Sequence, residues 1–316
     1  MMYKNTCKLI FSNFHLVWKT LLYQIFASLV CIGLMFACSL PIVNVIKSNG
    51  VFSLISSSFN DFSNTFNIYK LFSDLILAVE TFFNVILANI STLWLYIILL
   101  LFILIIVRTV ISNYSHFATT NVLYNYLSCN IKVSYTANLT QNFWKNLKFQ
   151  ISYLFIQLPI DILIIYCAYV LFKWLLSVSG LILIAPIILI MLLVLVYSFK
   201  ITLFSGWLPA LIVFECSIFK ALKRGFKAVF RRFYRSYSTV VALLATIIVF
   251  NVGCALCTFG ASLFLTLPIS SLALLIFNMV MFYCSQGMRF YVDNDNIVTT
   301  LKLEQTDAIS MQKYII

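Results

Sequence analysis

The sequence contains several apolar runs that are long enough to cross a lipid bilayer as a helix. The clearest extends from Leu93 to Val107 without a charged residue, and about 20 mostly apolar residues span the hydrocarbon core. Of the 316 residues, 63% are hydrophobic and 9% are charged, whereas about a quarter of the residues of a soluble domain are charged. The composition therefore predicts an all-α, polytopic bundle of transmembrane helices, because a β-barrel would show short alternating strands instead.

The apolar runs predict about six spans within a single integral membrane domain that covers residues 1–316. The predicted spans are residues 20–45, 91–111, 151–175, 181–199, 239–260 and 264–287. The tail, residues 289–316, is polar and mixed in charge, so we expect it to be cytoplasmic and mobile.

The first 19 residues show a helical stripe of positive charge. Its members are Lys4, Lys8, His15 and Lys19, and the side chains roughly opposite are Cys7, Ile10, Phe14 and Trp18. This pattern predicts an interfacial helix over residues 1–19 that leads into the first span. The alternative is that these residues are only the basic flank of that span.

Residues 51–90 combine apolar side chains with three acids. Asp74 and Glu80 lie within the apolar stretch 71–90, and an Asp at the centre of a span costs about 2.5–3.5 kcal/mol on the insertion scale. We therefore interpret this region as external amphipathic helix that lies on the membrane or on the bundle.

A strongly basic segment, residues 217–237, separates two of the apolar runs. Its basic residues are Lys220, Lys223, Arg224, Lys227, Arg231, Arg232 and Arg235, and it contains no acid. On a helix these seven side chains share one side, and the apolar residues Phe219, Leu222, Phe226, Val229, Phe230 and Phe233 fall nearly opposite. Ser217 is placed to cap the start of this helix. The pattern predicts a basic amphipathic helix on the cytoplasmic face, which contacts anionic lipid head groups or a partner, or which only fixes the orientation of the chain.

The distribution of basic residues supports this threading. With six spans and both termini inside, only Lys47, Lys70 and Lys173 of the 21 Lys and Arg residues fall outside, which leaves 18 inside. Such an excess of cytoplasmic Lys and Arg is the usual rule for cell-membrane proteins. It accounts for the net charge of +12 without invoking nucleic acid.

Asp161 is the carboxylate that lies deepest in a predicted span. It is about ten residues from the inner end, or about 15 Å at 1.5 Å per residue. An ionisable residue at that depth can bind a cation, relay a proton or contact a polar substrate. Alternatively, it is a neutral Asp that is hydrogen-bonded between helices. Lys200 is expected near the interface, so the sequence indicates no basic partner for Asp161.

The sequence gives little support for an enzyme, a metal site or a bound cofactor. It has no Gly-rich phosphate loop, no H-E-x-x-H and no G-x-S-x-G. His116 stands alone, whereas a metal site needs three or four ligands. Cys254 and Cys257 form a C-x-x-C inside a span, where cysteine usually packs as a small apolar residue. The scarcity of Gly and the abundance of Phe, Ile, Asn and Lys are typical of a low-GC bacterium.

The segment LPALIVFECSIFKALKRGFKAVFRRFYRSY, residues 208–237, resembles the multi-pass membrane domain found with bacterial glycerophosphodiester phosphodiesterases and its uncharacterised stand-alone relatives. The matching positions are Pro209, Glu215, Ala221, Leu222, Lys223, Arg224 and Phe226. Gly225 stands where that family usually has Ser. The phosphodiesterase domain is absent from this sequence, so the resemblance implies an integral membrane protein and brings no catalytic residues.

A second class with six spans and an N-terminal interfacial helix is the permease subunit of an ABC-type transporter. Such a permease binds a separate ATPase through a cytoplasmic helix, a role open to the basic segment or to residues 112–150. The importer-type docking loop expects a Gly six residues after its Glu, and the residue six after Glu215 is Ala221. The alternative that stays open is therefore a permease of the export type or of another transporter class, with an ATPase or another membrane subunit as its partner.

Overall fold

The computed structural model describes residues 2–177, 184–293 and 296–298. Within these residues six helices are long and apolar enough to cross a membrane. They are His15–Ser48, Ile90–Cys129, Phe143–Leu175, Ile187–Val213, Phe233–Cys257 and Leu263–Gln286. The predicted fold class, an all-α chain with about six spans, is confirmed. The fourth predicted span, residues 181–199, begins outside the described residues.

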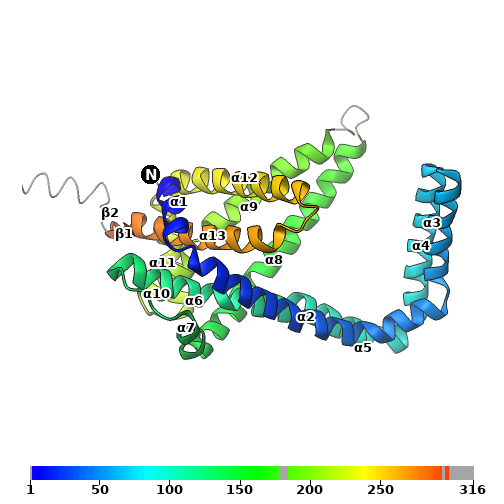
Figure 1. The fold of residues 1–316 in the computed structure, drawn as a ribbon, viewed down its shortest axis with the longest axis horizontal. Helices are drawn as coiled ribbons and strands as arrows, with labels where there is room; N and C mark the ends of the chain where they lie inside the picture. Colours follow the sequence, from blue (N-terminus) through cyan, green and yellow to red (C-terminus); the bar gives the residue numbers. More distant parts are fainter. Residues whose placement is uncertain (1, 178–183, 294–295, 299–316) are drawn as a thin grey trace, which may run out of the picture. The chain divides into compact units, whose positions relative to one another are not determined.

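The helices follow one another with short connections (Figure 1). In chain order they are α1 (Met2–Ser12), α2 (His15–Ser48), α3 (Val51–Thr65), α4 (Ile68–Ala88), α5 (Ile90–Phe102), a π-helical segment η1 (Ile103–Val107), α6 (Arg108–Cys129), α7 (Tyr135–Gln141), α8 (Phe143–Ser177), α9 (Ala185–Phe204), α10 (Trp207–Val213), α11 (Ile218–Phe230), α12 (Phe233–Cys257) and α13 (Leu263–Gln286). Because α5, η1 and α6 are continuous, they form one candidate span.

The contacts divide the chain into two compact units. The first combines the chain up to Gln24 with the chain from Asn113 onward, and the second is Ile25–Ser112. This division concerns contacts alone, so a single membrane domain over residues 1–316 stays a prediction.

In the second unit, α3 and α4 pack against each other and are joined by a turn at Phe66 and Asn67. The Asn67 side chain caps α4 by accepting a hydrogen bond from the backbone N–H of Lys70 at 3.1 Å. The Lys70 Nζ atom lies 2.7 Å from Asp61 Oδ2, and this hydrogen bond raises the pKa of Lys70. The interpretation of residues 51–90 as an external, non-spanning segment stays a prediction. The structure has a helical pair where the sequence suggested one helix.

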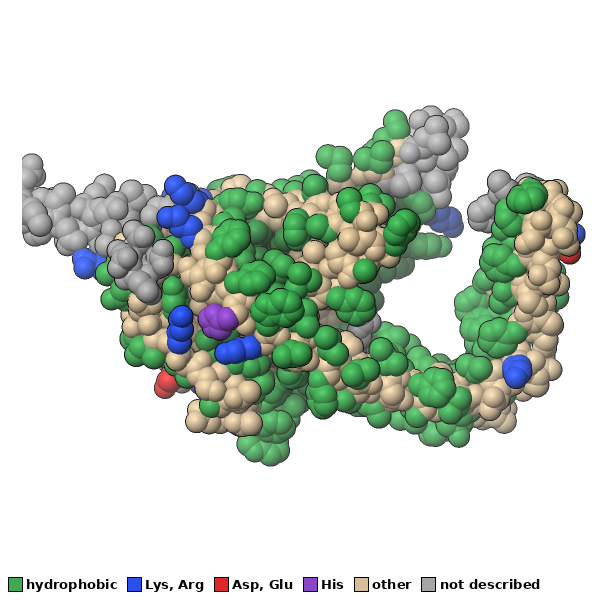
Figure 2. All heavy atoms as spheres, viewed as in Figure 1, with side chains coloured by type: hydrophobic (Ala, Val, Ile, Leu, Met, Phe, Trp, Pro, Cys, Tyr) green, Lys and Arg blue, Asp and Glu red, His purple; other side chains and the backbone are tan. Residues whose placement is uncertain are grey.

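The first unit is built around α13. Half of the most apolar stretch of α13 is buried, compared with 11–17% in the other candidate spans. Leu272, Ile276, Met279, Val280 and Phe282 are fully buried, and α13 contacts α1, α10, α11 and α12. The other spans turn large apolar side chains outward (Figure 2), as expected for helices that are solvated by lipid on one side.

The N-terminal helix α1 packs on α13 and on strand β1 (Phe290–Asp293). It ends at Ser12, and a new helix begins at His15, so residues 1–19 do not form one helix. The face that packs on protein consists of Met2, Asn5, Thr6 and Leu9, whereas Phe14 and Trp18 are exposed. A polar residue is tolerated there because the Thr6 hydroxyl donates to the Met2 carbonyl oxygen at 2.9 Å.

Part of the predicted tail is ordered. Strand β1 pairs in an antiparallel manner with β2 (Asn296–Val298). Phe290 and Val292 are buried because alternate residues of a strand point to the same face, and the Ser12 hydroxyl donates to the Val292 carbonyl oxygen at 3.3 Å. The expectation of a mobile tail was therefore wrong for this hairpin. Residues 299–316 lie outside the described part of the chain.

Helices α10 and α11 approach each other closely at two glycines. A Cβ atom added to Gly225 would lie 2.7 Å from the carbonyl carbon and oxygen of Gly206, a distance that real Cβ atoms do not tolerate. In this chain the contact therefore depends on the absence of a side chain.

We predict that Gly225→Ala lowers the stability of the purified protein by about 1–3 kcal/mol, because overpacking a tight contact forces the backbone apart. Thermal unfolding in mild detergent measures the change. The matched control is Gly253→Ala in α12, where nothing lies within 4 Å of the added Cβ and Ala has the higher helix propensity. Equal unfolding temperatures for the two variants would contradict the role given to the contact.

Candidate functional site

The seven basic residues lie on three consecutive elements and form what we call the basic surface. Helix α11 carries Lys220, Lys223, Arg224 and Lys227, the following turn carries Arg231 and Arg232, and α12 carries Arg235. All are exposed except Arg232, which is partly buried. Among the described residues the ion pairs are Lys70–Asp61 and Lys200–Asp161, so no carboxylate neutralises the basic surface.

The segment 217–237 is not one helix. Helix α11 ends at Phe230, and Arg232 has a non-helical backbone with φ −138° and ψ 34°. The break lets α11 pack against α9, α10 and α13, while α12 starts a new span beside α9. Ser217 has the extended backbone of a cap residue, but its side chain forms no capping hydrogen bond. The prediction of a single capped helix was therefore wrong, although the cationic side chains stay together.

The buried face of α11 is made of small residues. Ala221, Gly225, Ala228 and Val229 are buried, because the close approach to α10 leaves no room for larger side chains. On the apolar side of α11, Leu222 and Phe226 are partly buried, whereas Phe219 and Phe230 are exposed.

Exposed aromatic rings therefore lie among the cations. Phe219, Phe230 and Tyr234 are all exposed, and the Arg224 guanidinium lies 4.8 Å from the centre of the Phe214 ring. Aromatic and basic side chains together are typical of surfaces at the membrane–water interface. Figure 2 shows Lys and Arg side chains gathered over the end of the first unit that carries α1 and the start of α12.

Asp161 has a partner that the sequence did not indicate. Lys200 Nζ lies 2.5 Å from Asp161 Oδ1, and the Lys200 side chain is 14% exposed. The span was predicted to end at residue 199, but α9 continues to Phe204, and the candidate span continues to Val213. Lys200 therefore lies within the helix bundle, where its long side chain crosses to α8.

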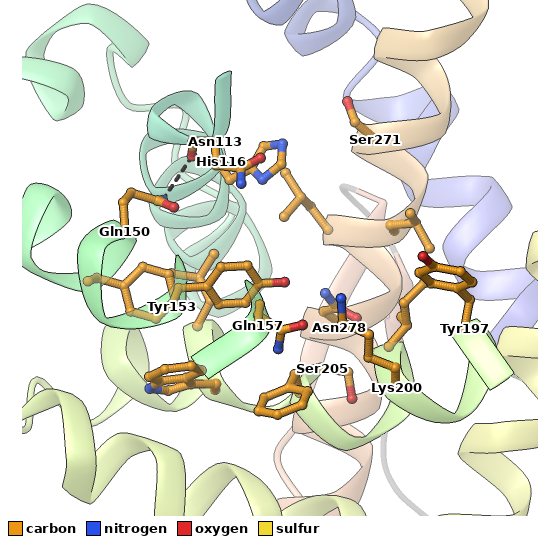
Figure 3. A pocket seen from close by; sticks show the side chains of 17 residues that line it. Asn113, His116, Gln150, Tyr153, Gln157, Tyr197, Lys200, Ser205, Ser271 and Asn278 are labelled. Atoms are coloured by element: carbon orange, nitrogen blue, oxygen red, sulfur yellow. Dashed lines mark hydrogen bonds between the residues drawn. The ribbon is translucent and has the colours of Figure 1, made fainter. Parts of the chain in front are cut away.

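A cavity of about 320 Å³ opens between α6, α8, α9, α10 and α13 of the first unit, and Figure 3 shows its lining. Most of its wall is apolar or aromatic. The polar groups are the amides of Asn113, Gln150, Gln157 and Asn278, the hydroxyls of Tyr153, Tyr197, Ser205 and Ser271, the imidazole of His116 and the ammonium group of Lys200. Gln150 is held in place because its Nε2 donates to the Asn113 carbonyl oxygen at 2.9 Å.

Our reading of the sequence missed this cavity, although α8 carries a signal for it. Asn146, Gln150, Tyr153, Gln157 and Asp161 follow one another at spacings of three and four residues, so they share one face of the helix. A polar stripe inside a span points to the bundle interior, because polar groups are costly in lipid. The partners from α6, α9 and α13 could not be found in this way.

The described residues contain no group of three or more His, Cys, Asp or Glu side chains that could hold a metal ion. His116 lines the cavity, but no carboxylate or thiol lies among the lining residues. The arrangement offers hydrogen-bond donors and acceptors and aromatic surface.

No protein family model, curated protein or solved structure matches the chain. The resemblance to the membrane domain found with bacterial glycerophosphodiester phosphodiesterases therefore stays a prediction.

We predict that Asp161 and Lys200 stabilise the bundle as a coupled pair. Asp161→Asn leaves the mostly buried Lys200 ammonium without its carboxylate, and Lys200→Gln leaves the carboxylate without its cation, so each single variant should lower the unfolding temperature. The double variant should lose less stability than the sum of the losses of the two single variants, and the difference should be about 1–3 kcal/mol. Thermal unfolding of the four proteins in mild detergent measures this coupling, and additive losses would contradict it.

Proposed function

We propose that this multi-pass membrane protein is non-enzymatic and that its basic surface binds anionic lipid head groups at the cytoplasmic face of the cell membrane. The observation that carries the proposal is a set of seven cations with no carboxylate partner among the described residues. No carboxylate of the described residues neutralises them, so the anionic head groups of lipid are suitable partners.

The physical chemistry of the membrane surface supports this choice. Each Lys or Arg beside an anionic leaflet contributes about 1 kcal/mol of attraction, so seven together contribute several kcal/mol. The exposed rings of Phe219, Phe230 and Tyr234 add apolar contact at the depth of the head groups. The electrostatic part should weaken with added salt, because the Debye length falls as ionic strength rises.

To test the lipid proposal, the protein is placed in nanodiscs of mixed phosphatidylglycerol and phosphatidylcholine and then released from them. The amount of phosphatidylglycerol that stays bound to it is measured. Replacing Arg231, Arg232 and Arg235 by Gln should lower the affinity for phosphatidylglycerol about tenfold or more, because three attractive charges are removed. Native mass spectrometry counts the bound lipids.

The matched control replaces Lys47, Lys70 and Lys173 by Gln. This variant also loses three positive charges, but at positions that the charge distribution predicts to lie outside the cell. It should keep the wild-type preference for phosphatidylglycerol. Equal losses in both variants would mean that net charge, and not the basic surface, decides the binding.

The proposal also requires a defined topology, with both termini and the basic surface inside. We predict that a membrane-impermeant maleimide labels Asn64→Cys in intact cells, and that it labels Thr136→Cys only after the cells are permeabilised. Both positions are exposed, and the test uses a background without the nine native cysteines. The reverse labelling pattern would place the basic surface outside and refute the lipid proposal.

A permease subunit that works with a separate ATPase is the second candidate function. The observation that favours it is the polar cavity among α6, α8, α9 and α13, because transported molecules bind between spans. Copurification in mild detergent distinguishes the two functions. A stoichiometric ATPase would support the permease, and enriched anionic lipid alone would leave transport without support.

A further inference from the structure

The cavity contains a buried amide whose hydrogen-bonding groups are both unused. Gln157 is 4% exposed, and neither its Nε2 nor its Oε1 has a hydrogen-bond partner within the described residues. Asn278 Oδ1, which belongs to another residue of the lining, is also buried without a partner. Native proteins rarely leave such groups unsatisfied, so the cavity presents one amide donor group and two acceptor oxygens to something other than the described residues.

These groups point toward a common space. Figure 3 shows the side chains of Tyr153, Gln157 and Asn278 directed into the middle of the cavity from α8 and α13. The neighbouring Lys200 already has a counter-charge, because Asp161 holds its Nζ atom. The interior of the cavity is therefore polar but close to neutral in charge.

The aromatic part of the wall is fixed by its own packing. The rings of Phe149 and Trp207 are 5.2 Å apart between their centres, and those of Tyr153 and Trp207 are 5.7 Å apart. Trp207 is anchored further because its Nε1 donates to the Ile218 carbonyl oxygen at 3.0 Å. The cavity thus combines a rigid aromatic wall with free amide groups, the combination of apolar surface and few polar groups that small-molecule sites share.

The hydrogen-bonding atoms of Gln157 and Asn278 that have no partner among the described residues restrict the class of ligand. Gln157 Oε1 and Asn278 Oδ1 are acceptors and need a donor, which a deprotonated phosphate or carboxylate without other groups does not offer. A pure hydrocarbon would leave all three atoms unsatisfied. A metal ion would need carboxylate, thiolate or several imidazole ligands, and the lining has none beyond one His. A hydroxyl group both donates and accepts, and the C–H faces of a hydroxylated ring or chain pack on aromatic rings.

We propose that this cavity binds a neutral hydroxylated molecule, a sugar or a polyol, through the amides of Gln157 and Asn278 and the aromatic wall formed by Phe149, Tyr153 and Trp207. The volume of about 320 Å³ is at the lower end of the range for small-molecule sites, which suits a single sugar or polyol unit. The same unit could be free or could be the head group of a lipid. The site is separate from the basic surface, so it does not depend on the lipid proposal.

The test compares the compounds that remain bound to the wild type, to Gln157→Met and to Asn251→Leu. Each protein is purified in lauryldimethylamine oxide, because maltoside detergents carry sugar units that would compete. Bound compounds are extracted, partitioned between water and chloroform, and identified by mass spectrometry. Asn251→Leu is the matched control, because Asn251 Oδ1 is also buried without a partner but Asn251 is not among the residues that line the cavity.

The expected result is a neutral hydroxylated compound that is retained about tenfold less by Gln157→Met than by the wild type and by Asn251→Leu, since a lost pair of hydrogen bonds weakens binding by about that factor. Recovery in water identifies a free sugar or polyol, and recovery in chloroform identifies a lipid-linked one. Met is close to Gln in size and removes two unsatisfied atoms, so the variant should fold. If it aggregates, Asn278→Leu replaces it.

Three results would overturn the proposal. The first is that the wild type and Gln157→Met retain the same compounds in equal amounts. The second is that the compound lost from Gln157→Met carries no hydroxyl group. The third is that the wild type retains no compound, which would mean that water alone fills the cavity. A failure of this kind leaves the phosphatidylglycerol test unaffected, because that test uses other residues.

Discussion

Helix α13 and the helices that bury it hold the first unit together. In a bilayer the outward faces of the spans gain nothing by packing, because lipid is as apolar as the side chains that meet it. Stability then depends on close contact between helices. This chain achieves it by burying α13 among α1, α10, α11 and α12 and by bringing α10 and α11 together at Gly206 and Gly225. The basic surface is positioned by that contact, because α11 lies on its small-residue face and turns its cations outward.

The polar groups inside the first unit are of two kinds, those that pair with each other and those that have no hydrogen-bond partner among the described residues. Asp161 and Lys200 satisfy each other, so their charges are compensated within the bundle. Gln157 and Asn278 are left with unused hydrogen-bonding atoms, so they are available to a molecule that enters the cavity. The same polar stripe of α8 supplies Gln157 and Asp161. Asp161 has a partner because α9 brings Lys200 to it, whereas Gln157 faces the cavity that Asn278 of α13 also lines.

Much of the architecture could be predicted from the sequence, because hydropathy and charge act locally. The apolar runs determine where candidate spans occur, and the six that the structure describes lie close to the predicted ones. Two errors arose where tertiary contacts override local pattern. The segment 217–237 has one continuous helical pattern but breaks at Arg232, because α11 and α12 pack on different neighbours. Residues 1–19 carry one continuous helical stripe, but the helix is interrupted between Ser12 and His15, and α1 packs on α13 and β1 through Met2, Asn5, Thr6 and Leu9.

The sequence by itself determined that this is a multi-pass helical membrane protein with a concentrated positive charge, because span length, hydrophobicity and the count of Lys and Arg are properties of short segments. Only the tertiary structure decided that Lys200 meets Asp161, that Phe219 and Phe230 stay exposed, and that Gln157 faces a cavity with Asn278. These relations join residues from different helices, and which faces meet depends on packing across the whole unit. That packing is not encoded in the periodicity of any single segment.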